Sequence, residues 1–106
     1  MERFSWATVP VEQLTPLITR QVVHTVDLTM LRSSFRKGAT VPEHQHVHAQ
    51  LTTVVSGRLR IDMAEASAEL GPGEILRVES DVPHSAEALE DTVVLDVFTP
   101  ARTDWQ

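Results

Sequence analysis

Three of the five histidines in this 106-residue chain fall within five positions, at His44, His46 and His48, and Gln50 follows two positions later. Residues two apart in an extended strand point to the same face, so we expect these four side chains to project together. A small β fold could also bring His84 close to them. Neutral imidazole, completed by an amide or carboxylate oxygen, is a common ligand of Zn, Cu, Fe or Ni. The pattern therefore predicts a metal site, the alternative being a polar strand on the surface.

A second group of side chains that could do chemistry lies near the C-terminus. Asp96 and Phe98 share one face of an expected strand, and an aspartate in such an apolar segment is costly to bury unless it is paired or used. Asp96 is therefore either the partner of a nearby arginine or a general acid/base whose pKa is raised by burial. Arg102 could fold over a pocket mouth and hold a carboxylate in bidentate fashion, or it is a tail charge in solvent.

Several other residues admit two roles each. Gln50 is a metal ligand or a structural amide bonded to backbone. His48 faces the substrate or is an ordinary exposed histidine. Phe98 is a pocket wall or part of the core. His24 stands alone in the sequence, and we expect it to be structural or on the surface.

The elements that must position these residues read as short strands. Turn signals at Gly38, Ser56-Gly57 and Gly71-Pro72-Gly73 separate segments rich in Val, Thr, Leu and Ile. The expected strands are residues 20–26, 28–36, the histidine segment, 51–55, 58–63, a short one within 64–70, then 74–79, 85–89 and 92–99. We expect one domain made of an irregular arm with a short strand or turn (1–19), a barrel (20–99) and a tail (100–106). Such spacing indicates an all-β sandwich or barrel.

Composition narrows the function classes. At 11.8 kDa the chain has the size of one domain, and its formal charge of −6 argues against nucleic acid or an anionic membrane as partner. No apolar run approaches the roughly 20 residues needed to span a bilayer, and the first residues lack the apolar stretch of a signal peptide. The absence of cysteine excludes disulfides and thiolate ligands. We expect a cytoplasmic protein.

With these motifs in place, the sequence resembles the cupin family. The first cupin motif is a glycine, five residues, His-x-His, three or four residues, a glutamate, six residues and a glycine. Gly38, His44, His46, Gln50 and Gly57 fill it here, with glutamine in place of the usual glutamate. The second motif resembles residues 73–84. Its departures are Glu79 and Asp81 in place of the usual proline and glycine, and Ala88 in place of asparagine.

A narrower resemblance, to the KdgF type of small cupin from pectin degradation, covers nearly the whole chain. The pieces that carry it are Trp6, Arg20-Gln21-Val22-Val23, Phe35-Arg36-Lys37-Gly38-Ala39, residues 44–50 and, above all, the end Asp96-Val97-Phe98-Thr99-Pro100-Ala101-Arg102-Thr103-Asp104. That end looks like the Asp-x-Phe-Ser-Pro-x-Arg-x-Asp signature of the type. Ala49 and Thr53 depart from a frequent glutamate and tyrosine, so substrate contacts near the pocket mouth are expected to differ.

The resemblance implies a double-stranded β-helix, or jelly roll, and a homodimer in which the N-terminal arm crosses over. It implies one divalent metal (Mn, Fe, Co, Ni or Zn) held by His44, His46, Gln50 and His84. It also implies a reaction, the linearisation of 4,5-unsaturated uronates to open-chain keto acids. Asp96 would then move the proton and Arg102 orient the substrate carboxylate, with Phe98 and His48 as substrate contacts. The alternatives are a metal-dependent dioxygenase and a non-catalytic module that binds a sugar acid or a metal.

Overall fold

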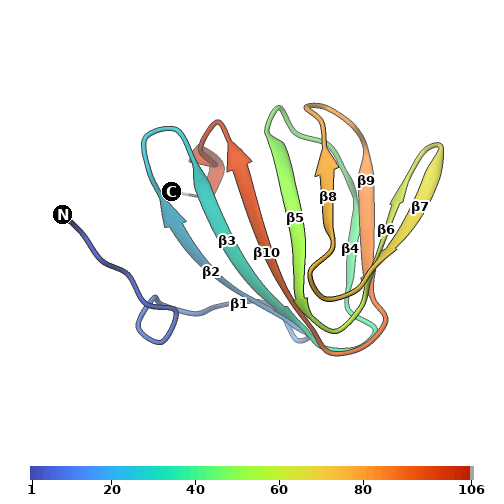
Figure 1. Ribbon diagram of the computed structural model, residues 1–106, viewed down its shortest axis with the longest axis horizontal. Coiled ribbons are helices and arrows are strands. Elements are labelled where there is room, and N and C mark those ends of the chain that lie inside the picture. Colours follow the sequence, from blue (N-terminus) through green and yellow to red (C-terminus); the bar gives the residue numbers. More distant parts are fainter. Residues whose placement is uncertain (106) are drawn as a thin grey trace.

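Two antiparallel sheets form the molecule, and they lie against each other in Figure 1, which shows the computed structural model. The structure describes residues 1–105. The strands are β1 (Glu12–Thr15), β2 (Ile18–His24), β3 (Thr29–Phe35), β4 (Thr40–His44), β5 (Ala49–Ser56), β6 (Leu59–Met63), β7 (Ala66–Leu70), β8 (Ile75–Val78), β9 (His84–Ala88) and β10 (Thr92–Thr99). One sheet has the order β1-β2-β3-β10-β5-β8 and the other β4-β9-β6-β7. This is the predicted jelly roll.

Side chains of alternating residues fill the space between the sheets. On β10 and β5 the register pairs Val94 with Val54, Asp96 with Thr52, and Phe98 with Gln50. The paired valines join a buried apolar cluster with Leu59, Ile61 and Leu70. The same two strands thus carry apolar side chains at one end of the sandwich and polar or aromatic ones at the other. The close-packed apolar end therefore holds β5 and β10 in place, and with them the polar side chains at the other end.

The turn at Gly57 joins β5 to β6 and closes the packed end. Gly57 has a φ of +88°, and a Cβ there would lie 2.3 Å from the carbonyl oxygen of Asp91. Only glycine fits this left-handed, crowded position. The sequence correctly placed a tight turn here.

The first 19 residues are more ordered than a wholly irregular arm. The expected short strand is β1, which pairs with β2 at the edge of the large sheet. The segment before β1 is held by Gln21 of β2, whose side chain donates hydrogen bonds to the carbonyl oxygens of Trp6 and Val9, at 2.6 and 2.8 Å. The first residues run away from the sheets in Figure 1.

The C-terminal segment folds back over the sandwich instead of trailing from it. After β10 a 3-10 turn, η1 (Thr103–Trp105), returns to the polar end, where the backbone N–H of Arg102 donates to Thr29 Oγ1 at 2.7 Å. Within residues 1–105, no helix is long and apolar enough to cross a membrane.

Candidate active site

The histidine segment is not one extended strand, so the prediction of a shared strand face was wrong. β4 ends at His44 in the small sheet and β5 begins at Ala49 in the large one, and residues 45–48 cross between them. The crossing loop is held by the β8–β9 loop, where Asp81 N–H donates to His46 O at 2.8 Å. Sheet pairing places His44 opposite His84. The ligand atoms of His44, His46 and His84 consequently lie within 4.8 Å of one another.

Each of these three rings is oriented by a backbone carbonyl. The Nδ1 atoms of His44, His46 and His84 lie 2.8, 2.9 and 2.8 Å from the carbonyl oxygens of Pro42, His48 and Val82. A carbonyl can only accept, so each Nδ1 carries a hydrogen, and in the neutral ring Nε2 then has the lone pair. Metal-binding histidines are held in this way.

Burial favours the uncharged form of two of the rings. The pKa of His46 is lowered by desolvation and then by the charge of Arg102. The pKa of His84 is lowered by desolvation and, among its neighbours, by His44 and Arg102. Metal ligation needs the neutral imidazole, so the environment favours the competent form.

A chain of hydrogen bonds links Gln50 of β5 to Asp96 of the neighbouring strand β10. Gln50 Nε2 donates to Thr52 Oγ1 at 2.9 Å, and Thr52 Oγ1 donates to Asp96 Oδ1 at 2.5 Å. Gln50 Oε1 and His46 Nε2 are both buried and have no hydrogen-bond partner in the described part of the chain. Buried acceptors without partners are costly and rare. The two atoms, with the two other imidazoles, therefore suit a divalent metal.

The Asp96 carboxyl has an unusual acidity. Desolvation raises its pKa from 3.8 to about 6, against the opposing effects of the Thr52 hydrogen bond and the Arg102 charge. The expected shared face of Val94, Asp96 and Phe98 is confirmed, since all three are buried. A carboxyl of this acidity can both give and take a proton near neutral pH.

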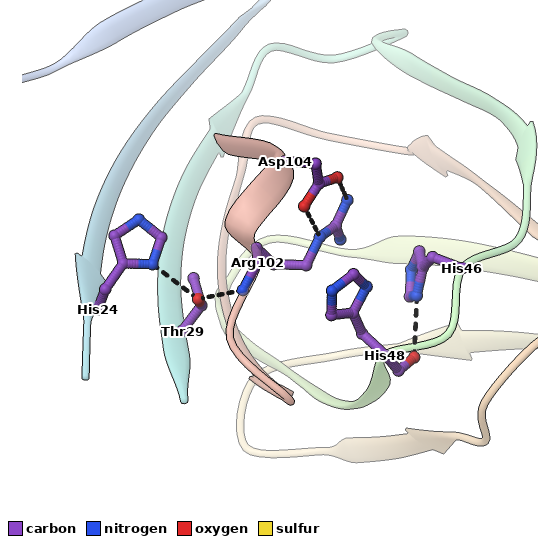
Figure 2. A network of polar contacts seen from close by, with 6 residues as sticks. All are labelled: His24, Thr29, His46, His48, Arg102 and Asp104. Carbon is purple, nitrogen blue, oxygen red and sulfur yellow. Dashed lines mark hydrogen bonds and ion pairs between the residues drawn. The ribbon is translucent and has the colours of Figure 1, made fainter. Parts of the chain in front are cut away.

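Arg102 is not a tail charge in solvent. Its side chain is 9% exposed, and its Nε and Nη2 donate to the two carboxylate oxygens of Asp104 at 3.1 and 2.9 Å. The guanidinium carbon also lies 4.8 Å from the centre of the Phe98 ring and 3.9 Å from that of Trp105. Figure 2 shows the Arg102–Asp104 pair beside the histidines.

Figure 2 shows the other two histidines, His48 beside His46 and His24 beside Thr29. His48 is buried, not exposed, and its ring centre is 5.3 Å from that of His46. It does not line the cavity formed by residues 1–105, so its substrate contact stays a prediction. His24 Nδ1 lies 2.8 Å from Thr29 Oγ1, the acceptor of Arg102 N–H. His24 therefore supports the C-terminal segment.

One cavity of about 290 Å³ joins these groups. Its polar wall includes His44, Gln50, Thr52, His84, Asp96 and Arg102, and Phe98 is an aromatic wall, as expected for a pocket. Sequence reasoning missed Thr52, Arg20 and Trp105, which also line it. Strand parity with Gln50 could have revealed Thr52. Nothing in the local sequence marks Trp105, because it reaches the cavity only through the fold of the C-terminal segment.

Comparison with known proteins supplies the family. The model of the cupin domain matches residues 31–98, which span the cavity-lining strands β3 to β10. The chain is a cupin. No curated protein matches it, but solved structures do.

Two of these structures cover almost all of this cupin. KdgF from Halomonas sp. is 31% identical with a TM-score of 0.93, covering 99% of this chain and 100% of that one. An RmlC-like cupin from Shewanella frigidimarina is 28% identical with a TM-score of 0.92, covering 100% and 97%. Oxalate decarboxylase from Lactobacillus farciminis, at 21% identity and a TM-score of 0.82 over 92% of this chain and 32% of its own, shares the fold. The chain is thus a small cupin resembling KdgF.

Proposed function

We propose that this cupin is a metal-dependent enzyme that opens the ring of 4,5-unsaturated uronates and releases open-chain keto acids. The observation that carries the proposal is the buried carboxyl of Asp96, whose pKa is about 6, in one cavity with His44, His84 and Gln50. Full-length likeness to KdgF from Halomonas sp. supports it, because the sequence resemblance to that type implies this reaction. We expect this reaction to take place in the cytoplasm.

The proposed metal ligands are His44, His46, Gln50 and His84. A divalent transition metal bound there, one of Mn, Fe, Co, Ni or Zn, would supply Lewis-acid polarisation of a substrate oxygen. The glutamine amide is neutral, so the protein would not offset the charge of the ion as a carboxylate would.

Asp96 is the proposed acid/base. Its Oδ1 accepts from Thr52, which leaves Oδ2 to exchange a proton with the substrate. Ring opening is an isomerisation: a proton leaves the hemiacetal hydroxyl as the ring C–O bond breaks, and a proton returns to the carbon of the enol. One carboxyl that alternates between its two protonation states can serve both transfers, and no oxidant is needed.

Arg102 is proposed to bind and orient the substrate carboxylate. Asp104 accepts one N–H from Nε and one from Nη2, so both N–H groups of Nη1 and the second one of Nη2 remain as donors. Asp104 fixes the plane of the guanidinium, and the rings of Phe98 and Trp105 hold it at the cavity. Phe98 and His48 are proposed to contact the sugar.

The test follows the ultraviolet absorbance of a 4,5-unsaturated monouronate mixed with the purified protein, without oxygen, in the presence and absence of a chelator. Rapid, chelator-sensitive loss of the conjugated double bond is expected. No change with metal-loaded protein would contradict the uronate reaction. A reaction that proceeds only when oxygen is admitted would point to the dioxygenase alternative, and a ligand bound and released unchanged would point to the non-catalytic one.

A further inference from the structure

Arg20 places a second guanidinium in the wall of the cavity. It lies on β2 opposite Ser33 of β3, and both residues line the cavity. Its side chain is only 14% exposed. Its guanidinium carbon is 4.6 Å from the centre of the Trp105 ring, the same ring that Arg102 approaches to 3.9 Å. Two cationic side chains therefore meet at one indole beside the proposed catalytic groups.

The donors of Arg20 are less well satisfied than those of Arg102. Its Nη2 lies 3.3 Å from Glu12 Oε2, and the Glu12 side chain is 52% exposed at the edge of the sheet. Its Nε is buried and finds no acceptor within residues 1–105. A buried donor on a charged group is costly to leave without a partner, so this N–H is ready for an acceptor that enters the cavity.

The charge of the cavity wall indicates the kind of acceptor. The chain carries a formal charge of −6. The wall instead carries two arginines, Arg20 and Arg102, against one carboxyl, Asp96, so the positive charges outnumber the negative one even when Asp96 is ionised. An anion is therefore favoured inside a protein that is acidic as a whole. A planar guanidinium fits the two oxygens of a carboxylate better than it fits a single hydroxyl.

We infer that Arg20 is a substrate-binding residue that holds the carboxylate of an acidic sugar through its unpartnered Nε–H. The substrate class rests on the proposed function. Arg20 provides the main charge-assisted contact, and Arg102, tied to Asp104, provides further donors. The two arginines then select uronates over neutral sugars of the same size.

The test measures binding of galacturonate, a saturated uronate that cannot undergo the reaction, by calorimetry with metal-loaded protein. Arg20→Gln should weaken galacturonate binding at least about tenfold. Arg20→Lys keeps the charge but loses the planar guanidinium, so its affinity for galacturonate should lie between those of Arg20→Gln and the unchanged protein. Glu12→Gln is the matched control, because it removes the ion pair of Arg20 but leaves its guanidinium. It should bind galacturonate at least as well as the unchanged protein. Galactose, which lacks the carboxylate, should bind Arg20→Gln and the unchanged protein equally weakly.

Three results would overturn the inference: galacturonate binding unchanged in Arg20→Gln, an equal loss in Glu12→Gln, or an equal loss of galactose binding. Failure of the proposed reaction is distinguishable from these. A protein that binds galacturonate through Arg20 but does not turn over the unsaturated uronate would contradict the reaction and leave the role of Arg20 standing. A protein that turns over the unsaturated uronate but does not bind galacturonate would contradict the role of Arg20 alone.

Discussion

Thr52 determines which end of the Gln50 amide faces the histidines. A hydroxyl has one hydrogen, and the ionised carboxylate of Asp96 can only accept it. The Thr52 oxygen is then left as an acceptor, so it takes the Nε2 end of the amide and turns Oε1 away from itself. Oε1 is the end that could bind a metal. One hydrogen-bond chain thus connects the proposed acid/base to the proposed ligand.

The first prediction concerns this chain. Thr52→Val keeps the shape of the side chain and removes the hydroxyl, so the Gln50 amide can turn over. Affinity for Ni or Zn, measured by calorimetry, should fall by about 10- to 100-fold, as is typical when a group that orients a ligand is lost. Thr52→Ser should restore it. Thr53→Val is the matched control, because the Thr53 hydroxyl bonds to Glu74 O instead. Wild-type affinity in Thr52→Val would refute the orienting role.

The second prediction concerns the cost of keeping Asp96 buried. Its folded-state pKa of about 6 exceeds the ordinary 3.8, so the folded protein binds the proton more tightly than the unfolded chain does. The resulting stability is fully present below about pH 3.8 and is lost as pH rises to about 6. Roughly two units of pKa correspond to about 3 kcal/mol at most.

Asp96→Asn removes that charge while keeping the size of the side chain. In chelator-treated protein at pH 8, urea unfolding should show the variant to be more stable by up to about 3 kcal/mol, and at pH 4 the two proteins should be nearly equal. Turnover of the unsaturated uronate should be almost lost, with metal content unchanged. A variant that keeps the full rate would refute the acid/base role, and one that is less stable at pH 8 would refute the raised pKa.

Among the turns with a glycine at positive φ, the β5–β6 turn is the most crowded. Gly57→Ala must accommodate both a positive φ and a Cβ against Asp91 O and the Thr92 side chain, at 2.3 and 2.5 Å. Stability should fall by more than about 2 kcal/mol in thermal or urea unfolding. Gly38→Ala is the control, since its φ of +87° is similar but nothing lies within 4 Å of the added Cβ. Its loss should be about 1–2 kcal/mol. Equal losses would show that crowding at Gly57 is unimportant.

Features that depend on residues close in the sequence could be predicted from it, whereas features that depend on distant residues could not. The alternation of Val94, Asp96 and Phe98 and the turn at Gly57 depend on neighbouring residues, and both were predicted correctly. The path of residues 45–48 depends on bonds from Ser80 and Asp81, more than thirty positions away, so a single straight strand was expected instead.

The position of the C-terminal segment also depends on contacts with residues distant in the sequence. Arg102 is anchored at Thr29, 73 positions earlier in the sequence, and only then do Arg102 and Trp105 reach the cavity. Arg20 was noticed as part of a resemblance and not as a cavity residue. The alternation of side chains along β2 turns Arg20 inward. The structure explains why a charged side chain is accepted there, because the Trp105 ring packs against its guanidinium.

At the scale of the whole molecule, the outer face of the large sheet carries several apolar side chains among polar ones. Sheet register places Met30, Val97 and Leu51 in one row across β3, β10 and β5, and Leu95 and Ile75 in the adjacent row, on either side of Thr53. We call these five residues the outer strip. Leu51 is 49% exposed and Ile75 65%. Contiguous apolar side chains on a surface commonly mark an interface. A homodimer is also what the sequence resemblance implies, so we expect a second copy of this chain as the partner.

The last prediction is therefore a homodimer through the outer strip. Light scattering after size exclusion should give about twice the 11.8 kDa of one chain. Leu51→Lys puts a charge into the strip and should shift the protein toward the mass of one chain, because an unpaired charge is costly to bury. Leu28→Lys is the matched control: Leu28 is similarly exposed, at 44%, but it lies in the β2–β3 turn and outside the strip. It should remain dimeric. If the unchanged protein has the mass of one chain, or if both lysine variants stay dimeric, the outer strip is not the interface. Since the cavity lies between the two sheets of one chain, turnover by a monomeric Leu51→Lys protein is expected to persist.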